Sequence, residues 1–200
     1  MEHSELVKKF YAMSTEEVYA SMLSNQVYAL MFHDQMASYF DFLGLNGFKR
    51  MHEYQYLSES ILYRKIQRFF INRHNEIVEP HEVENPHVIP ADWSKHNRKE
   101  VTPAIRIRSV KDAFEDYREW EQHTEEYLSA CAVVLCDRGL VVDYIFVKEL
   151  VEDVGKELKQ IDRLMLELSA VDYDMTYIEE IQCKLHKKYK KKTHHVGSEL

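Results

Sequence analysis

Apolar residues recur at steps of three or four over most of this chain, which is the spacing of one face of an α-helix. Four such stretches are each about 30 residues long, so the helices they predict would extend about 40–45 Å. Polar N-caps and short glycine breaks mark their ends. The pattern predicts helices over about residues 14–43, 46–75, 109–137 and 140–169, and a shorter fifth helix over about 174–190.

The connections between these helices differ in length and composition. Residues 44–47 and the turn at Gly139 are short, which makes the helices on either side antiparallel neighbours. Residues 76–108 hold all four prolines, many charges and no helical period. A segment this long fits a crossover along a bundle, after which the next helix begins near Ser109. The chain 1–200 is therefore expected to be a single all-α domain, a four-helix bundle with one long crossover and a short fifth helix.

Composition narrows the class of protein. Only five glycines and four prolines interrupt the chain, which favours long helices over a β-sandwich. A formal net charge of -8 disfavours a nucleic-acid partner and attracts cations. Three cysteines without close pairing indicate no disulfide framework and fit a reducing, cytoplasmic compartment. We expect neither export nor a membrane span, because the sequence has no signal peptide and no apolar run of about 18 residues.

Two junctions of the predicted bundle carry a family resemblance. The runs are Tyr39-Phe40-Asp41 followed by Leu43-Gly44-Leu45-Asn46-Gly47-Phe48, and Ala113-Phe114-Glu115 followed by Glu119-Trp120-Glu121-Gln122. They resemble the junction of the first two helices and the start of the third helix in bacterial ferritins. The resemblance spans about residues 15–190 and implies a ferritin-like bundle and a homo-oligomeric cage of 24 subunits. It also implies a di-iron centre inside each bundle that oxidises Fe(II), with ferric mineral stored in the cage.

The resemblance places the family's iron ligands on positions that are only partly kept. The ligand types that remain are Glu59 on the second helix, Glu121 on the third, Asp153 in place of a glutamine on the fourth, and His33 in place of a tyrosine beside the site. Carboxylate oxygens with an imidazole suit iron. These four residues are therefore the candidate metal ligands, and iron is the candidate metal.

Three other positions of the centre have lost their ligands. Neutral Gln26 replaces a glutamate of the first helix, Leu62 replaces the imidazole of the second, and cationic Lys156 replaces an acid of the fourth. Buried carboxylates need a partner, a proton or a metal ion. Three interpretations remain open: Lys156 forms a salt bridge with Glu59 and Glu121, or the two acids and the neighbouring imidazole hold one metal ion, or a complete di-iron centre survives.

Acidic residues outside this centre offer further candidate sites. The crossover holds Glu79, His81, Glu82 and Glu84, which either bind metal weakly on the outer face of a cage or are simply solvated. Asp143 matches a carboxylate that lines the three-fold pores of related cages, although a solvated Asp near a helix start is equally consistent. The basic end of the chain is interpreted as a solvated helix end.

The sequence therefore predicts a cytoplasmic ferritin-like cage that binds and stores iron, with weak or no ferroxidase activity of its own. Two alternatives remain: a structural or interaction shell protein that has lost its iron function, and an active ferroxidase with a rearranged site. Iron uptake, and its dependence on Glu59, distinguish the three hypotheses.

Overall fold

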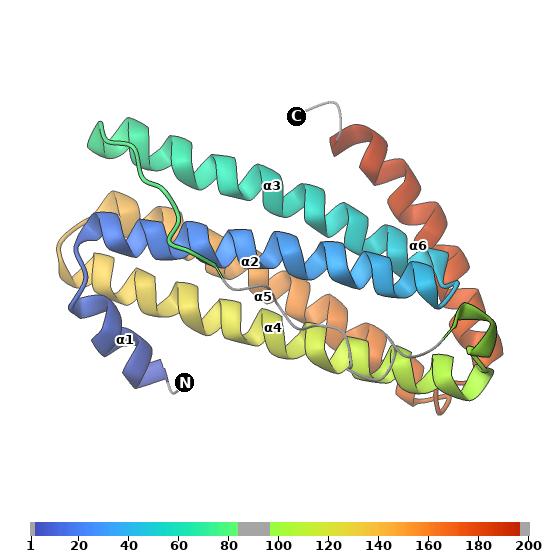
Figure 1. Ribbon diagram of the computed structural model, residues 1–200. Coiled ribbons are helices and arrows are strands. Elements are labelled where there is room, and N and C mark those ends of the chain that lie inside the picture. The colour runs from blue at the N-terminus through green and yellow to red at the C-terminus, as the bar shows by residue number, and fades with distance from the viewer. Residues whose placement is uncertain (1–2, 84–96, 197–200) are drawn as a thin grey trace.

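The computed structural model describes residues 3–83 and 97–196, and all regular secondary structure within these ranges is helical. The elements are α1 (His3–Tyr11), α2 (Thr15–Phe42), α3 (Asn46–His74), the 3-10 turn η2 (Arg98–Glu100), α4 (Pro103–Asp137), α5 (Val141–Ser169) and α6 (Met175–Val196). Figure 1 shows α2 to α5 side by side as a bundle, with α1 beside α4 and α6 crossing the opposite end against α3. The predicted all-α bundle with a fifth helix is confirmed. None of the described helices is both long and apolar enough to cross a membrane.

Local capping chemistry sets the helix boundaries. Ser14 and Glu17 form a reciprocal box at the start of α2, in which each side chain accepts a hydrogen bond from the other residue's amide. Thr102 caps α4 through an amide of the first turn, and Pro103 is the first helical residue. Proline is favourable there because no helical hydrogen bond is lost. The predicted start near Ser109 is therefore wrong, and that residue is buried inside α4.

The N-terminal helix α1 has nine residues, too few for the periodicity to predict it. Leu6 and Phe10 are buried, and the Phe10 ring meets the edge of Tyr127 on α4 at 4.9 Å between centroids. The Arg138 guanidinium donates to the Phe10 carbonyl at 3.1 Å. These contacts close one end of the bundle with apolar surface.

The bundle has two hydrophobic clusters with a polar layer between them. The cluster at the α1 end includes Leu23 and Leu128, and the cluster at the α6 end includes Phe40 and Phe114. The buried polar side chains of this layer include Gln26, Glu59, Glu121 and Thr124, which line one cavity. Burying polar side chains costs free energy of folding unless they are hydrogen-bonded. This layer is therefore the part of the interior that is most consistent with a functional site.

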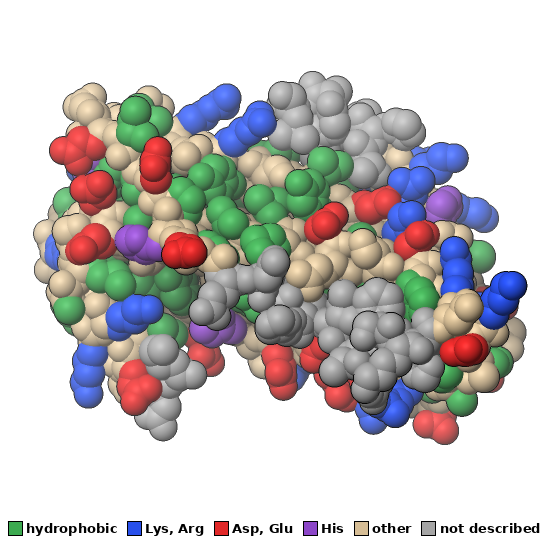
Figure 2. All heavy atoms as spheres, viewed as in Figure 1, with side chains coloured by type: hydrophobic (Ala, Val, Ile, Leu, Met, Phe, Trp, Pro, Cys, Tyr) green, Lys and Arg blue, Asp and Glu red, His purple; other side chains and the backbone are tan. Residues whose placement is uncertain are grey.

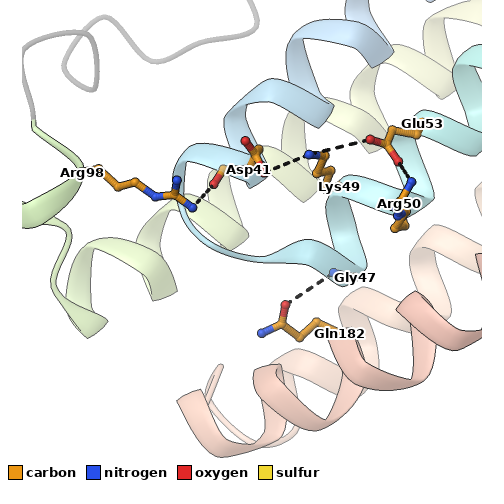
Figure 3. A network of polar contacts seen from close by, with 7 residues as sticks. All are labelled: Asp41, Gly47, Lys49, Arg50, Glu53, Arg98 and Gln182. Atoms are coloured by element: carbon orange, nitrogen blue, oxygen red, sulfur yellow. Dashed lines mark hydrogen bonds and ion pairs between the residues drawn. The ribbon is translucent and has the colours of Figure 1, made fainter. Parts of the chain in front are cut away.

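Contacts from η2 and α6 hold the turn between α2 and α3 (Figure 3). Arg98 donates to the Asp41 carbonyl at 3.0 Å, and the Lys49 ammonium lies 2.9 Å from the Asp41 carboxylate. On the other side, Gly47 contacts α6 so closely that a Cβ there would lie 1.9 Å from the Gln182 carbonyl oxygen. Only glycine allows this approach, which fixes α6 against α3.

Candidate metal centre

Three glutamates from three helices line one small cavity in the polar layer. Glu59 comes from α3, Glu121 from α4 and Glu157 from α5, and the cavity they share has a volume of about 60 Å³. A space for one water needs about 10–15 Å³ on this measure, so the cavity has room for a few waters or a hydrated cation. Gln26 of α2 and Thr124 of α4 complete its polar lining.

Burial and mutual repulsion raise the pKa of all three acids. Burial raises the pKa of Glu59 to about 8, with a further contribution from Glu157. Burial also raises the pKa of Glu121 well above its usual range, and the charges of Glu157 and Glu59 add to it. Glu157 shifts in the same direction through burial, opposed by a hydrogen bond from Gln55. The charge of Lys192 lowers the pKa of Glu157, but no lysine or arginine of the described residues lines the cavity itself, so the cluster favours bound protons or a bound metal ion.

Two neutral oxygens beside these acids have no hydrogen-bond partner among the described residues. They are Gln26 Oε1 and Thr124 Oγ1, and both are buried. Together with the carboxylates they form an all-oxygen donor set, which suits hard cations. In the described ranges no three His, Cys, Asp or Glu side chains are already placed to hold one metal ion. A cation would therefore have to draw the carboxylates closer together.

The expected salt bridge from Lys156 to Glu59 and Glu121 is wrong. Lys156 Nζ lies 2.7 Å from Asp153 Oδ1, and the two side chains are 67% and 64% exposed. One helical position separates Lys156 from the inward-facing Glu157, a rotation that turns the ammonium to solvent. Asp153 borders the cavity but mostly faces water.

Glu157 is the site residue that the family pattern missed. It lies three positions after Val154 and four before Ile161, on the buried stripe of α5. This spacing places it on the core-facing side of the helix. The helical period alone identifies it as the acid that α5 contributes to the cavity.

His33 lies outside the carboxylate cavity. Its Nδ1 is 3.0 Å from Nδ1 of His52, so one imidazole donates to the other, and its ring packs on the edge of Tyr117. Burial lowers the pKa of His33 to about 3 and that of His52 well below its usual range. Both rings are neutral at physiological pH and belong to the α6-end core. Leu62 lies in the cavity wall, where the ferritin resemblance implies an imidazole.

Asp143 is buried and paired in the single chain, so the expectation of a solvated side chain is wrong. Its role at a three-fold pore stays a prediction. The Asp143 side chain is fully inaccessible to solvent. Its carboxylate accepts hydrogen bonds from the Tyr19 hydroxyl at 3.0 Å and Arg73 Nε at 3.3 Å, and His74 Nε2 lies 2.7 Å away. Asp143 therefore ties the start of α5 to α2 and the end of α3.

The acidic residues of the crossover do not form one site in the described segment. Glu79 and His81 border a hollow beside the start of α2, whereas Glu82 borders a different hollow beside Trp120. The His81 amide donates to Ser24 Oγ at 2.8 Å, which anchors the segment on α2. Glu84, the remaining predicted surface ligand, lies outside the described residues.

Solved structures with this fold include ferritins. An engineered closed form of the Archaeoglobus fulgidus ferritin aligns with a TM-score of 0.71 at 20% identity, covering 87% of this chain and 96% of that one. The open-pore ferritin of the same archaeon gives 0.71 at 20% identity, with coverage of 86% and 95%. A humanized archaeal ferritin gives 0.72 at 19% identity, with coverage of 87% and 97%. No protein-family model and no curated protein matches the sequence. The predicted ferritin-like fold is confirmed.

Proposed function

We propose that this chain is the subunit of a ferritin-like cage that binds and stores iron, with weak or no ferroxidase activity. The fold supports the class of protein, since chains of known structure with this architecture include ferritins. One observation inside the bundle carries the proposal. Glu59, Glu121 and Glu157 converge on a cavity whose lining also holds two oxygens without a hydrogen-bond partner. Among the described residues, no lysine or arginine lines it.

The ligands of the same cavity are the reason to expect weak or no ferroxidase activity. Cycling of iron between Fe(II) and Fe(III) at a paired centre needs a dense, fixed ligand set. Here Leu62 and Gln26 occupy two positions where the ferritin resemblance implies an imidazole and a carboxylate. The remaining carboxylates bind a cation without holding a pair of ions at fixed separation. Iron in this proposal is cargo, oxidised largely by oxygen in solution.

Exposed apolar surface supports the cage part of the proposal. Figure 2 shows hydrophobic side chains gathered over the middle of the face on which α2 and α3 lie. Tyr56 and Ile71 of α3 and the following Ile77 are 39%, 41% and 74% exposed. Exposed apolar surface of this kind is typical of a protein-protein contact. We propose copies of this chain as the partner, in the 24-subunit shell that the resemblance implies, and a reducing cytoplasm as its compartment because all three cysteines are free.

Iron retention by the sized particle tests this function. Purified metal-free protein would be mixed with Fe(II) under air and passed over a size-exclusion column, with iron and protein measured across the peak. We expect a particle much larger than the 23.9 kDa chain that carries iron. The double variant Glu59→Gln with Glu121→Gln should keep the particle and lose part of the iron, whereas Glu119→Gln with Glu126→Gln, two exposed acids on α4, should match wild type.

The alternatives give different results in the same experiment. A large particle that never carries iron would indicate a structural shell. A 23.9 kDa monomer under all conditions would refute the cage.

A further inference from the structure

A second, larger cavity lies on the α6 side of the bundle. It has a volume of about 400 Å³ and is walled by α3, α5 and α6, with Phe114 and Tyr117 of α4 at its base. Glu157 borders both this cavity and the smaller carboxylate cavity. The volume falls in the range of small-molecule sites, roughly 300–1,000 Å³. None of its lining except Glu157 is shared with the proposed iron cavity.

The charge at this cavity is opposite to that of the whole chain. Lys188 and Lys192 lie one turn apart on α6, and the charge of Lys192 lowers the pKa of Glu157 in the same cavity. Arg163 also lines it, but Glu167 neutralises that guanidinium at 3.1 Å. Glu157 also lines the cavity, so its lining holds three cationic and two acidic side chains. On a chain of net charge -8, these two ammonium groups form a local site for an anion.

Aromatic rings hold the two ammonium groups in place. Lys192 Nζ lies 5.0 Å from the centre of the Tyr54 ring and 5.6 Å from that of Tyr189, and Lys188 Nζ lies 4.9 Å from the Tyr189 ring. Cation-π contacts at this range restrict lysine side chains that would otherwise be mobile. Desolvation and the charge of Lys192 lower the pKa of Lys188, so an approaching anion would relieve repulsion between the two.

The remaining walls are apolar or neutral. Met51, Phe114, Leu164 and Leu185 supply aliphatic and aromatic surface from four helices. At the inner end, Gln55 Nε2 donates to the Tyr117 hydroxyl at 2.9 Å, so these polar groups are satisfied. A ligand for this cavity therefore needs an acidic head and an apolar body, and flat bodies suit the aromatic walls best.

We propose that the cavity between α3, α5 and α6 binds a small amphipathic organic anion, with its acidic head at Lys188 and Lys192 and its flat apolar body between Phe114 and Leu185. This site is separate from the proposed iron function and does not rest on it. An occupant would also cover Glu157, the wall shared with the carboxylate cavity.

Calorimetric titration of the full-length, metal-free protein with 2-naphthoate tests the site. Wild type should bind 2-naphthoate, and it should bind the neutral isostere 2-naphthalenemethanol about tenfold more weakly, because the head contacts are charge-assisted. Lys188→Gln with Lys192→Gln should weaken 2-naphthoate binding by about tenfold or more. Lys184→Gln with Lys187→Gln removes the same charge from exposed positions of α6 and should leave binding within about twofold of wild type.

A variant that fills the cavity provides a second readout. Leu185→Trp should abolish binding while leaving the far-ultraviolet circular dichroism of the helical chain unchanged. The proposal is overturned if wild type does not bind 2-naphthoate, or if the neutral isostere binds as tightly. Equal weakening by both lysine pairs would assign the effect to net charge and would also overturn it.

Discussion

Glu59→Gln will make the metal-free protein more stable than wild type in alkaline solution, and the difference will grow with pH. Burial raises the pKa of Glu59 from 4.5 to about 8 in the folded chain. A raised pKa means that the folded state holds a proton which the unfolded state releases. The contribution of Glu59 to stability is thus fully present below about pH 4.5 and is lost as pH rises through about 8. Glutamine cannot ionise and so avoids this loss.

Between pH 5 and pH 8 the advantage of Glu59→Gln over wild type in unfolding free energy should grow by about 3 kcal/mol. Each pKa unit corresponds to about 1.4 kcal/mol, and relaxation of the structure around the charged Glu59 will lower the total. Urea denaturation at several pH values, in the same state of assembly, measures it. His33 and His52 destabilise both proteins equally at low pH, so the difference between the two isolates Glu59. Glu119→Gln on the exposed side of α4 is the control and should show no such trend. A pH-independent difference would mean that Glu59 is compensated in the fold.

Asp143→Ala will cost about 3 kcal/mol of stability, the second large effect that we expect. The substitution removes the only described acceptor of the buried Tyr19 hydroxyl and leaves Arg73 and His74 without their shared partner. The penalty is less than for a fully buried ion pair because Arg73 is 43% exposed and can turn to water.

The control for this variant lies on the same helix. Asp153→Ala removes an exposed carboxylate whose partner Lys156 is also exposed, so its cost should stay within about 0.5 kcal/mol. Denaturant midpoints of wild type and the two variants measure how much stability each substitution removes. If Asp143→Ala were as mild as Asp153→Ala, the buried pairing of α5 with α3 would carry no net stability.

The sequence predicted the fold because apolar periodicity is long and regular in α2, α3, α4 and α5. The prediction was wrong or incomplete where helix capping or tertiary contacts, rather than apolar periodicity, determine a helix. Pro103 was taken as part of an irregular crossover, yet a proline in the first turn is a helix start. α1 is too short to display a period, and tertiary contacts at Phe10 hold it.

The candidate site was only partly predictable for a geometric reason. Glu59 and Glu121 were found because the ferritin resemblance places iron ligands at these two positions, and both side chains are buried. Transferring a family pattern onto α5 pointed one position away from the acid that faces inward, Glu157. One position on a helix is a rotation of about 100°, enough to exchange an interior acid for an exposed Lys156. The partners of Asp143 come from α2 and the end of α3, and no local pattern connects these segments.

Oxidation of Fe(II) under air tests the central claim most directly. Ferric absorbance would be followed after adding Fe(II) to metal-free wild type, to Glu59→Ala and to buffer alone. We expect wild type and Glu59→Ala to oxidise iron at similar, slow rates, because the proposed carboxylate site lacks a ligand set for paired iron. Fast oxygen-dependent oxidation by wild type that Glu59→Ala abolishes would contradict this expectation and would establish the cavity as a working ferroxidase centre.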